Sequence, residues 1–180
     1  MNGNYGKLLY LTIFIIISCG TNRITASREN KFVQHESLTV IPDSILLDKT
    51  ITKIILSPSW IIEGPIAVAA ETPGKNNLTK LPDNICKLER LKVLDLCMNN
   101  IKELPYCFDQ LQNLEELDLS YNLSFDIQNA LPIILRLKNL RKINLYGIKT
   151  VAENEKELRD NLNERKIKMI LTKADMLKYN

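Results

Sequence analysis

The sequence predicts an α/β solenoid of about four to five repeats, with a parallel sheet on its concave side and irregular or short helical segments on its convex side. Three segments share one pattern, namely an aliphatic residue, two tolerant positions, an aliphatic-proline pair, two more positions and an apolar residue; they begin at Leu38, Leu78 and Ile101. A second pattern, aliphatic-x-x-aliphatic-x-Leu, begins thirteen positions later in each case and occurs a fourth time, at Ile51, Leu91, Leu114 and Leu140.

The second pattern predicts a short strand in each repeat. Strand side chains alternate between faces, so Leu94 and Leu96 are expected to enter the core. One repeat cannot bury such a face alone, and neighbouring repeats must therefore stack. We expect Leu94, Leu117 and Ile143 to line up in successive parallel strands. Prolines occur at the same place in three repeats, on the return side where no ladder hydrogen bond is needed: Pro42, Pro82 and Pro105.

Together these features resemble the leucine-rich repeat, in its form of about 23 residues with a Leu-Pro pair in the second half. The resemblance runs from about Leu38 to Ile148. In that family, stacked asparagines pair with backbone groups that turn inward. The resemblance implies this structural role for Asn76, Asn99 and Asn122, and it implies that the concave face serves recognition.

The N-terminus predicts export and a lipid anchor. Residues 8–18 form an apolar stretch whose eleven residues would rise only ~16 Å as a helix, about half of a bilayer core. That length is typical of a signal peptide, expected here over 1–18. The following segment, Ile16–Gly20, resembles the lipobox of bacterial lipoproteins, which implies that Cys19 carries the lipid. A plain secretory signal and a retained anchor are the alternatives. Residues 19–37 are predicted to form a polar tether.

The repeats, expected over 38–151, depart from their period at two places. Ile51 and Leu91 are 40 residues apart, which indicates an apolar insertion near 60–75. It is expected either to pack over an edge of the array or to contact a ligand. The spacing from Leu114 to Leu140 is 26 residues, with the excess within 124–137. A helix and a strand over 152–171 are predicted to cap the core, and 172–180 are predicted to be a loose tail.

The outward strand positions predict the binding surface. They form two columns across the concave face, followed by contact-prone side chains just past the strands. The candidate binding residues are Lys53, Val93, Glu116 and Lys142; Ile55, Asp95, Asp118 and Asn144; and Met98, Tyr121 and Tyr146.

No catalytic motif is present in the sequence. It contains no phosphate loop, GxSxG or HExxH pattern, and its single histidine, His35, has no evident partner. Asp95 and Asp118 occupy equivalent positions in consecutive strands, which raises acid-base chemistry or, with Glu116, a calcium site as alternatives to solvated carboxylates. We favour solvated carboxylates and predict neither enzyme activity nor a cofactor or metal. The net charge of +3 is scattered, so nucleic-acid binding is not predicted.

Three cysteines besides Cys19 remain unassigned by the sequence. Cys86 and Cys107 lie in adjacent repeats, where they could form a disulfide or remain small buried thiols. Cys97 would then be left over.

The predicted function is that of an envelope protein, lipid-anchored to a membrane outside the cytoplasm, that binds another protein through its concave face. One alternative is a structural envelope protein without a specific ligand. Another is a secreted eukaryotic repeat protein, because two segments beginning at Asn77 and Asn122 match the glycosylation sequon. A ladder position for Asn122 would argue against its glycosylation.

Overall fold

The computed structural model describes residues 30–33, 38–57 and 77–179, which form one six-stranded sheet. The strands follow sequence order, and each pairs in parallel with the next. They are β1 (Lys31–Val33), β2 (Lys53–Ile55), β3 (Val93–Asp95), β4 (Glu116–Asp118), β5 (Lys142–Asn144) and β6 (Lys168–Ile170). The expected α/β solenoid with a parallel sheet is confirmed.

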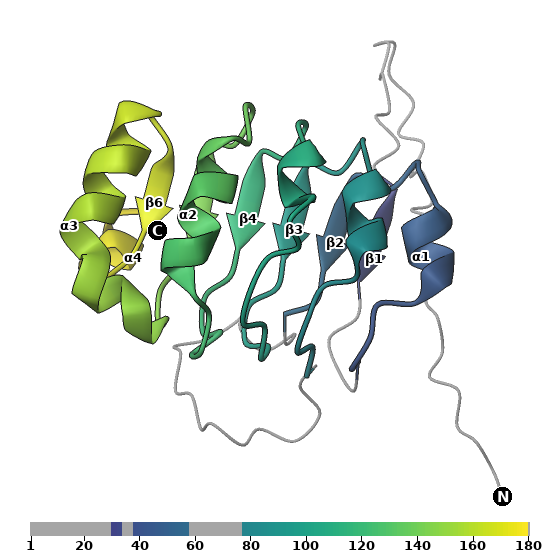
Figure 1. Ribbon diagram of the computed structural model, residues 1–180, viewed down its shortest axis with the longest axis horizontal. Coiled ribbons are helices and arrows are strands. Elements are labelled where there is room, and N and C mark those ends of the chain that lie inside the picture. Colours follow the sequence, from purple (N-terminus) through teal and green to yellow (C-terminus); the bar gives the residue numbers. More distant parts are fainter. Residues whose placement is uncertain (1–29, 34–37, 58–76, 180) are drawn as a thin grey trace, which may run out of the picture.

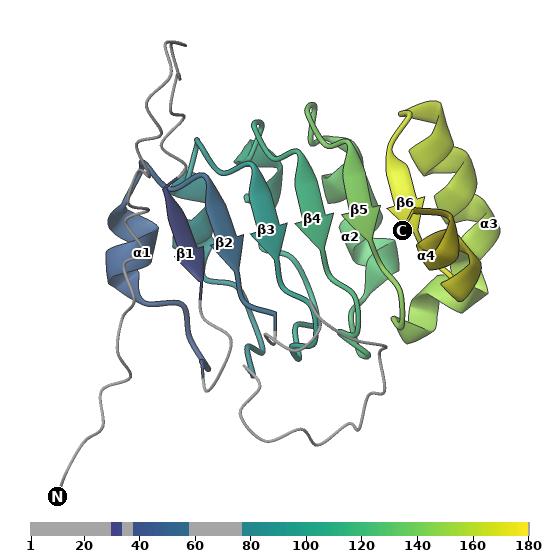
Figure 2. The same ribbon diagram turned by 180° about the vertical axis from the view of Figure 1, so that it is seen from behind.

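Helical segments cover one face of this sheet (Figure 1). They are α1 (Asp43–Leu47), the 3-10 helices η2 (Asp83–Lys87) and η3 (Phe108–Gln110), α2 (Ile127–Leu135) and α3 (Lys149–Glu164). The excess residues expected within 124–137 supply α2, so a longer coil has room for a longer helix. A last helix, α4 (Lys173–Tyr179), lies on the opposite side of the sheet, in front of β6 in Figure 2.

The core lies between the sheet and the helical layer. The central residue of each strand is buried because alternate side chains point inward. Leu94 pairs in register with Leu117, and Leu117 with Ile143, so the predicted alignment of the aliphatic row is confirmed. Ile54 and Met169 extend the row by one strand at each end.

Asn99 and Asn122 are buried at the turns that follow β3 and β4. Asn122 Oδ1 accepts from the Ile101 amide at 2.9 Å, and its Nδ2 donates to the carbonyls of Leu96 and Leu119, both at 2.9 Å. Asn99 makes the equivalent bonds one coil earlier. Each side chain thus satisfies backbone groups of two coils. The Asn122 side chain is fully enclosed, so its sequon is inaccessible in the folded chain.

The first strand corrects the predicted tether. Residues 31–33 fall within 19–37, yet they pair with β2, and Phe32 is buried in register with Ile54. The segment is polar overall, so its single buried aromatic side chain gave no periodic signal. Its amino-acid sequence does contain one clue, since Phe32 precedes Ile54 by 22 residues, close to one repeat.

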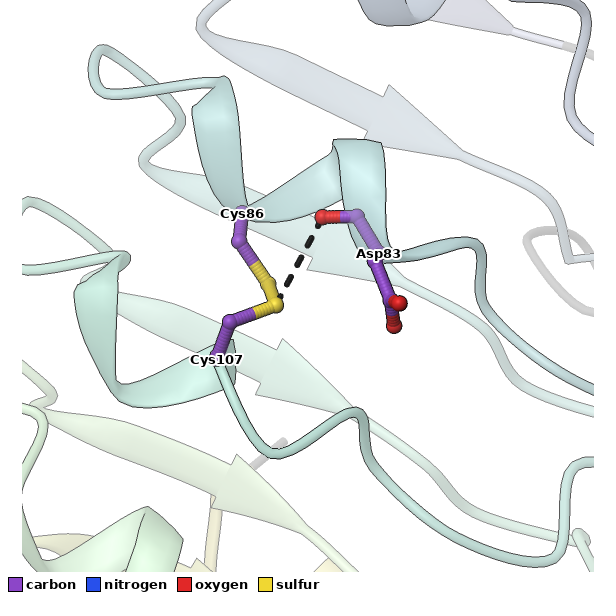
Figure 3. Close-up of a disulfide and its surroundings, with 3 residues drawn as sticks. All are labelled: Asp83, Cys86 and Cys107. Atoms are coloured by element: carbon purple, nitrogen blue, oxygen red, sulfur yellow. Dashed lines mark hydrogen bonds between the residues drawn. A yellow bond between two sulfur atoms is a disulfide. The ribbon is translucent and has the colours of Figure 1, made fainter.

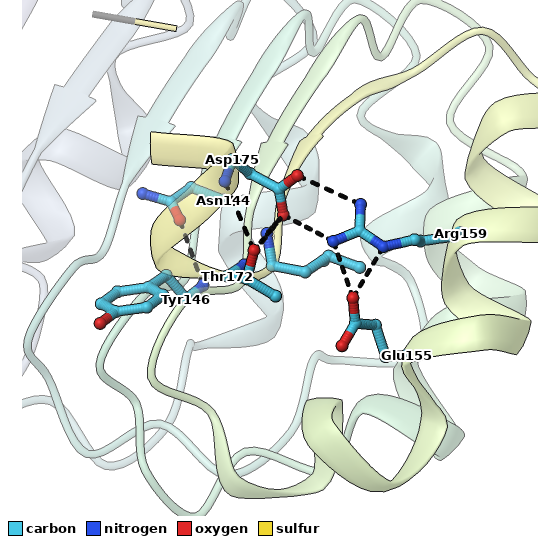
Figure 4. Close-up of polar contacts among 7 residues, drawn as sticks. Asn144, Tyr146, Glu155, Arg159, Thr172 and Asp175 are labelled. Atoms are coloured by element: carbon cyan, nitrogen blue, oxygen red, sulfur yellow. Dashed lines mark hydrogen bonds and ion pairs between the residues drawn. The ribbon is translucent and has the colours of Figure 1, made fainter. Parts of the chain in front are cut away.

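The C-terminal residues correct the predicted loose tail, because residues 173–179 form α4. Thr172 and Asp175 make a capping box: Asp175 Oδ2 accepts from the Thr172 amide at 2.9 Å, and the Asp175 amide donates to Thr172 Oγ1 at 3.4 Å. Arg159 of α3 also donates to Asp175 through its two terminal guanidinium nitrogens, at 3.2 and 2.8 Å, and it pairs with Glu155 (Figure 4). These bonds lower the pKa of Asp175. The predicted cap over 152–171 is present as α3 and β6, and α4 extends it.

A disulfide joins Cys86 and Cys107 on the helical side of the sheet (Figure 3). It links η2 to the segment before η3, so it connects two consecutive coils. Cys107 Sγ also lies 3.5 Å from the carbonyl oxygen of Asp83. The sequence left the state of these two residues open, and the fold decides it by bringing their Cα atoms to 5.9 Å. Cys97 is a buried free thiol.

Several predictions concern residues outside the described ranges: the signal peptide over 1–18, the lipid site at Cys19, Asn76 and the insertion near 60–75. Among the described residues, no helix combines the length and the apolar character needed to cross a membrane.

Candidate functional site

The candidate site is the sheet face that lies opposite α1, α2 and α3 (Figure 2). We call it the open face and define it by the outward side chains of β2 to β5: Lys53, Ile55, Val93, Asp95, Glu116, Asp118, Lys142 and Asn144. Strand pairing places Lys53, Val93, Glu116 and Lys142 in one column and the other four in a second. Both columns are therefore arranged as the sequence predicts. The same eight side chains line a shallow hollow of about 190 Å³.

Backbone hydrogen bonds fix the spacing of the open face. Each strand has a buried central residue, so the outward side chains flank a row of packed core residues. The choice of side chain on this face need not alter the core, because strand residues alternate between faces. The open face is thus a rigid platform whose side chains can differ from coil to coil.

The second column is tied down by the turns that follow the strands. Asp95, Asp118 and Asn144 each accept from the amide two residues ahead, at 2.8–3.1 Å. Their remaining polar atoms link neighbouring coils: Ser57 Oγ donates to Asp95 at 2.7 Å, and Asn144 Nδ2 donates to Asp118 at 2.8 Å. These carboxylates are consequently more constrained than the solvated side chains that the sequence suggested.

Asp118 is the most perturbed acid of the open face. Burial and the nearby charge of Asp95 raise its pKa to about 6, against the lowering effect of its bonds from Ser120 and Asn144. Two carboxylates on adjacent strands disfavour ionisation of both. The acidic pair therefore carries negative charge that the surrounding groups do not fully offset.

Ion pairs occupy the first column and its border. Lys142 pairs with Glu116 at 3.5 Å, and the side chains remain 43% and 50% exposed. Just before the strands, the Glu115 carboxylate forms ion pairs with the Lys92 ammonium at 3.2 Å and with the Arg141 guanidinium at 3.9 Å. Such exposed pairs contribute little stability, so they remain available to exchange partners.

The aromatic candidates lie together at the end of β4 and β5. Tyr121 and Tyr146 meet edge to face with ring centroids 5.3 Å apart, and both are half-buried. Burial, together with the neighbouring Tyr146, raises the pKa of Tyr121 to about 12. This pair offers apolar area beside the charged columns.

Met98 does not belong to the open face, which corrects one predicted binding residue. Only 4% of it is exposed. Its backbone adopts a left-handed turn with φ 57°, as does that of Tyr121, which is only half-buried. The sequence position past the strand could not reveal how far this side chain is buried.

Two features of this surface were not predicted from the sequence. Lys31 and Lys168 extend the first column at its two ends, because β1 and β6 pair in register with the neighbouring strands. The helix α4 borders the open face beside β6 (Figure 2). The Thr172-Lys-Ala-Asp175 capping box was the signal that could have predicted this helix.

Chemically, the open face suits recognition. The described residues contain no histidine, and no group of three or more His, Cys, Asp or Glu side chains among them is placed to hold a metal ion. Burial raises the pKa of the Cys97 thiol far above its ordinary value, so this cysteine is a poor nucleophile.

The comparison with known families agrees with the geometry. Residues 74–123 match the family model described as "Leucine rich repeat". The fold is a short leucine-rich-repeat solenoid. Leucine-rich-repeat domains commonly bind other proteins. A leucine-rich-repeat protein of Leptospira interrogans is similar in structure, at 22% sequence identity and a TM-score of 0.38; the match covers 74% of this chain and 40% of that one. No curated protein matches the chain.

Proposed function

We propose that this leucine-rich-repeat chain is a lipid-anchored protein of the cell envelope that binds another protein through its open face. The observation that carries the proposal is the pair of in-register columns on β2 to β5. They present both signs of charge, apolar side chains and a neighbouring aromatic pair on a rigid sheet. Protein interfaces combine these ingredients: aromatic anchors, a polar rim and fixed geometry.

The disulfide supports a location outside the cytoplasm. Disulfides persist in oxidising compartments and are rare where thiols are kept reduced. Cys86 and Cys107 are bonded within one chain, on the helical side away from the open face. This argument is independent of the apolar stretch over 8–18 and of the segment Ile16–Gly20, which provide the case for export and for lipid attachment at Cys19.

Photocrosslinking tests the binding surface. A photoreactive phenylalanine analogue at Val93, on the open face, is expected to crosslink a defined protein in intact cells. The same analogue at Lys87, an exposed residue of η2 on the helical side, is the matched control and should not. Substitution of Tyr121 and Tyr146 by Ala should weaken the crosslink from Val93. Equal labelling from both positions would contradict the proposal, and no labelling from either would favour a structural role without a ligand.

The anchor requires a separate test. Wild-type protein should incorporate labelled fatty acid and sediment with membranes, and Cys19→Ala should do neither. Cys97→Ala is a matched control that leaves the proposed lipid site intact. If Cys19→Ala remains equally membrane-bound and wild type takes up no lipid, the lipid anchor is wrong, whatever the crosslinking shows.

A further inference from the structure

Basic side chains gather where the strands begin. All six strands are parallel, so their first residues lie along one edge of the sheet (Figure 2). We call this edge the basic edge and define it by the charged residues at the first strand position and at the four positions before it. Its cations are Lys31, Lys49, Lys53, Arg90, Lys92, Lys138, Arg141, Lys142, Arg165, Lys166 and Lys168, and its anions are Glu89, Glu115, Glu116 and Glu164.

The net charge of the basic edge exceeds that of the whole chain. Its eleven cations and four anions give a net charge of +7, whereas the other described residues hold nine cations and thirteen anions, a net charge of −4. The amino-acid sequence shows no dense basic run, because no coil contributes more than three of these cations. Stacking brings the small groups together, since neighbouring strands lie about 4.8 Å apart.

Hydrogen bonds between coils hold the segments of the basic edge against one another. The Arg141 amide donates to the Glu115 carbonyl at 2.8 Å, and the Glu115 amide donates to the Lys92 carbonyl at 2.8 Å. Slightly earlier along the coils, Asn113 Nδ2 donates to the Glu89 carbonyl at 2.8 Å. The backbone therefore fixes the spacing from which the charged side chains extend.

Much of the positive charge on this edge is not neutralised within the protein. The central glutamates Glu115 and Glu116 pair with Lys92, Arg141 and Lys142. Four other cations of the edge are exposed and form no ion pair with another described residue; these are Lys49, Arg90, Lys138 and Lys166. An anionic partner that approaches the edge thus meets accessible cations on both sides of the two glutamates.

The chain enters the fold at the same edge. Asn30, the residue before β1, is held there, because its carbonyl accepts from the Thr52 amide at 2.9 Å and its Nδ2 donates to Thr50 Oγ1 at 2.6 Å. Eleven residues separate Cys19 from Lys31, and a fully extended chain spans at most about 40 Å over that separation. A lipid on Cys19 would therefore keep the basic edge close to the membrane surface.

From this arrangement, and resting on the proposed function, we propose that the basic edge lies against the anionic head groups of the membrane that carries the lipid anchor. Each lysine or arginine near an anionic surface strengthens binding about fivefold. Asp95 and Asp118 lie two positions further along their strands, about 6.6 Å beyond the first column, so the acidic pair is on the side away from the membrane. The strands then point away from the membrane, and the open face stays free to bind the partner protein.

Flotation with lipid vesicles tests the proposal on the purified chain that begins at Gly20. Every described strand and every residue of the hydrophobic core lies after that position, so this chain keeps the described fold and lacks Cys19. It should bind vesicles of equal parts phosphatidylglycerol and phosphatidylcholine at least about tenfold more tightly than vesicles of phosphatidylcholine alone. Salt should remove most of this difference, because the Debye length falls from about 10 Å at 0.1 M to about 3 Å at 1 M.

Two sets of substitutions that remove the same total charge locate the contact. Lys49→Gln, Arg90→Gln, Lys138→Gln and Lys166→Gln together should weaken binding to the anionic vesicles at least about tenfold. The matched control combines Lys80→Gln, Lys102→Gln, Lys149→Gln and Lys173→Gln, all at exposed positions in segments that follow strands. The control should change binding less than about twofold, because those charges lie at the opposite edge and salt screens them. Thermal melts of both variants verify that the fold is kept.

Equal binding to both kinds of vesicle, an equal loss from both sets of substitutions, or no binding at millimolar lipid would overturn the proposal. Tighter binding to single-stranded DNA than to the anionic vesicles, at equal phosphate concentration, would also overturn it and would assign the basic edge to a nucleic acid. A failure of the proposed function is seen separately, by fatty-acid labelling at Cys19 and by crosslinking from Val93. If Cys19 carries no lipid while the chain from Gly20 binds anionic vesicles through the basic edge, the anchor is wrong and the membrane-binding surface stands.

Discussion

Gly147 packs against the ring of Tyr121 so closely that an added Cβ atom would lie 2.8 Å from Tyr121 Cδ1. Gly147 has φ +78° and takes the place in its coil that Met98 and Tyr121 occupy in theirs, three residues past the second column. The glycine therefore serves two needs at once: a left-handed turn, and room for the Tyr121 and Tyr146 ring pair.

The variant Gly147→Ala should lower the free energy of unfolding by about 1–3 kcal/mol, because it adds both backbone strain and the ring contact. Urea melts give the measurement. In a Tyr121→Ala background the same substitution should cost only the backbone part, about 1 kcal/mol. An equal loss in both backgrounds would show that the ring contact has no effect.

Replacement of Asn122 by leucine should destabilise the protein by about 1–3 kcal/mol, because the buried Ile101 amide and the Leu96 carbonyl lose their partner. Asn84→Leu is the matched control, since Asn84 is exposed, and its effect should stay within about 0.5 kcal/mol. Unchanged urea midpoints for both variants would show that Asn122 does not have this structural role.

The disulfide should contribute about 3 kcal/mol, because the sequence separation of 21 between Cys86 and Cys107 closes a loop of moderate length. The double variant Cys86→Ser, Cys107→Ser should lose that amount in a denaturant melt. A reducing agent should lower the stability of the wild type to a similar level and leave the double variant unaffected. Under native, non-reducing conditions, iodoacetamide should not label Cys97, since that thiol is buried; rapid labelling would contradict this placement.

The acidic pair should impose a pH dependence on stability. The folded protein raises the pKa of Asp118 from 3.8 to about 6, so it binds more protons than the unfolded chain between those values. Stability from this group should therefore fall as pH rises from about 4 to 6, and the penalty is complete above that range.

Asp95→Asn should reduce this penalty, because it removes the neighbouring charge while its amide can still donate to Ser57 Oγ and accept from the Cys97 amide. The variant is expected to be more stable than wild type at pH 7 by roughly 1 kcal/mol, and nearly equal to it at pH 4. Urea melts across this range measure the difference, and Asp83→Asn, at an exposed position of η2, is the control. A difference that does not vary with pH would mean that the two carboxylates do not interact.

Residues whose role is set by periodicity were predictable. Leu94, Leu117 and Ile143 had to share a row because each coil buries the same strand position, and Asn122 had to follow that strand because the backbone turns inward there. The outward columns came with them, since side chains alternate along a strand. By contrast, Phe32 has only its 22-residue distance from Ile54 to mark it within a polar segment, and Asp175 acts through Thr172 and Arg159 in a segment that carries no repeat.

The amino-acid sequence by itself determined the stacking of coils, the buried aliphatic rows and the identity of the side chains on the open face, because a fixed repeat length translates directly into spatial register. Only the tertiary structure decided that Cys86 bonds to Cys107, that Met98 is buried, that α4 borders the open face and that the pKa of Asp118 rises to about 6. Each of these depends on the distance, direction or solvent exposure of groups from different coils, and such quantities exist only once the chain has folded.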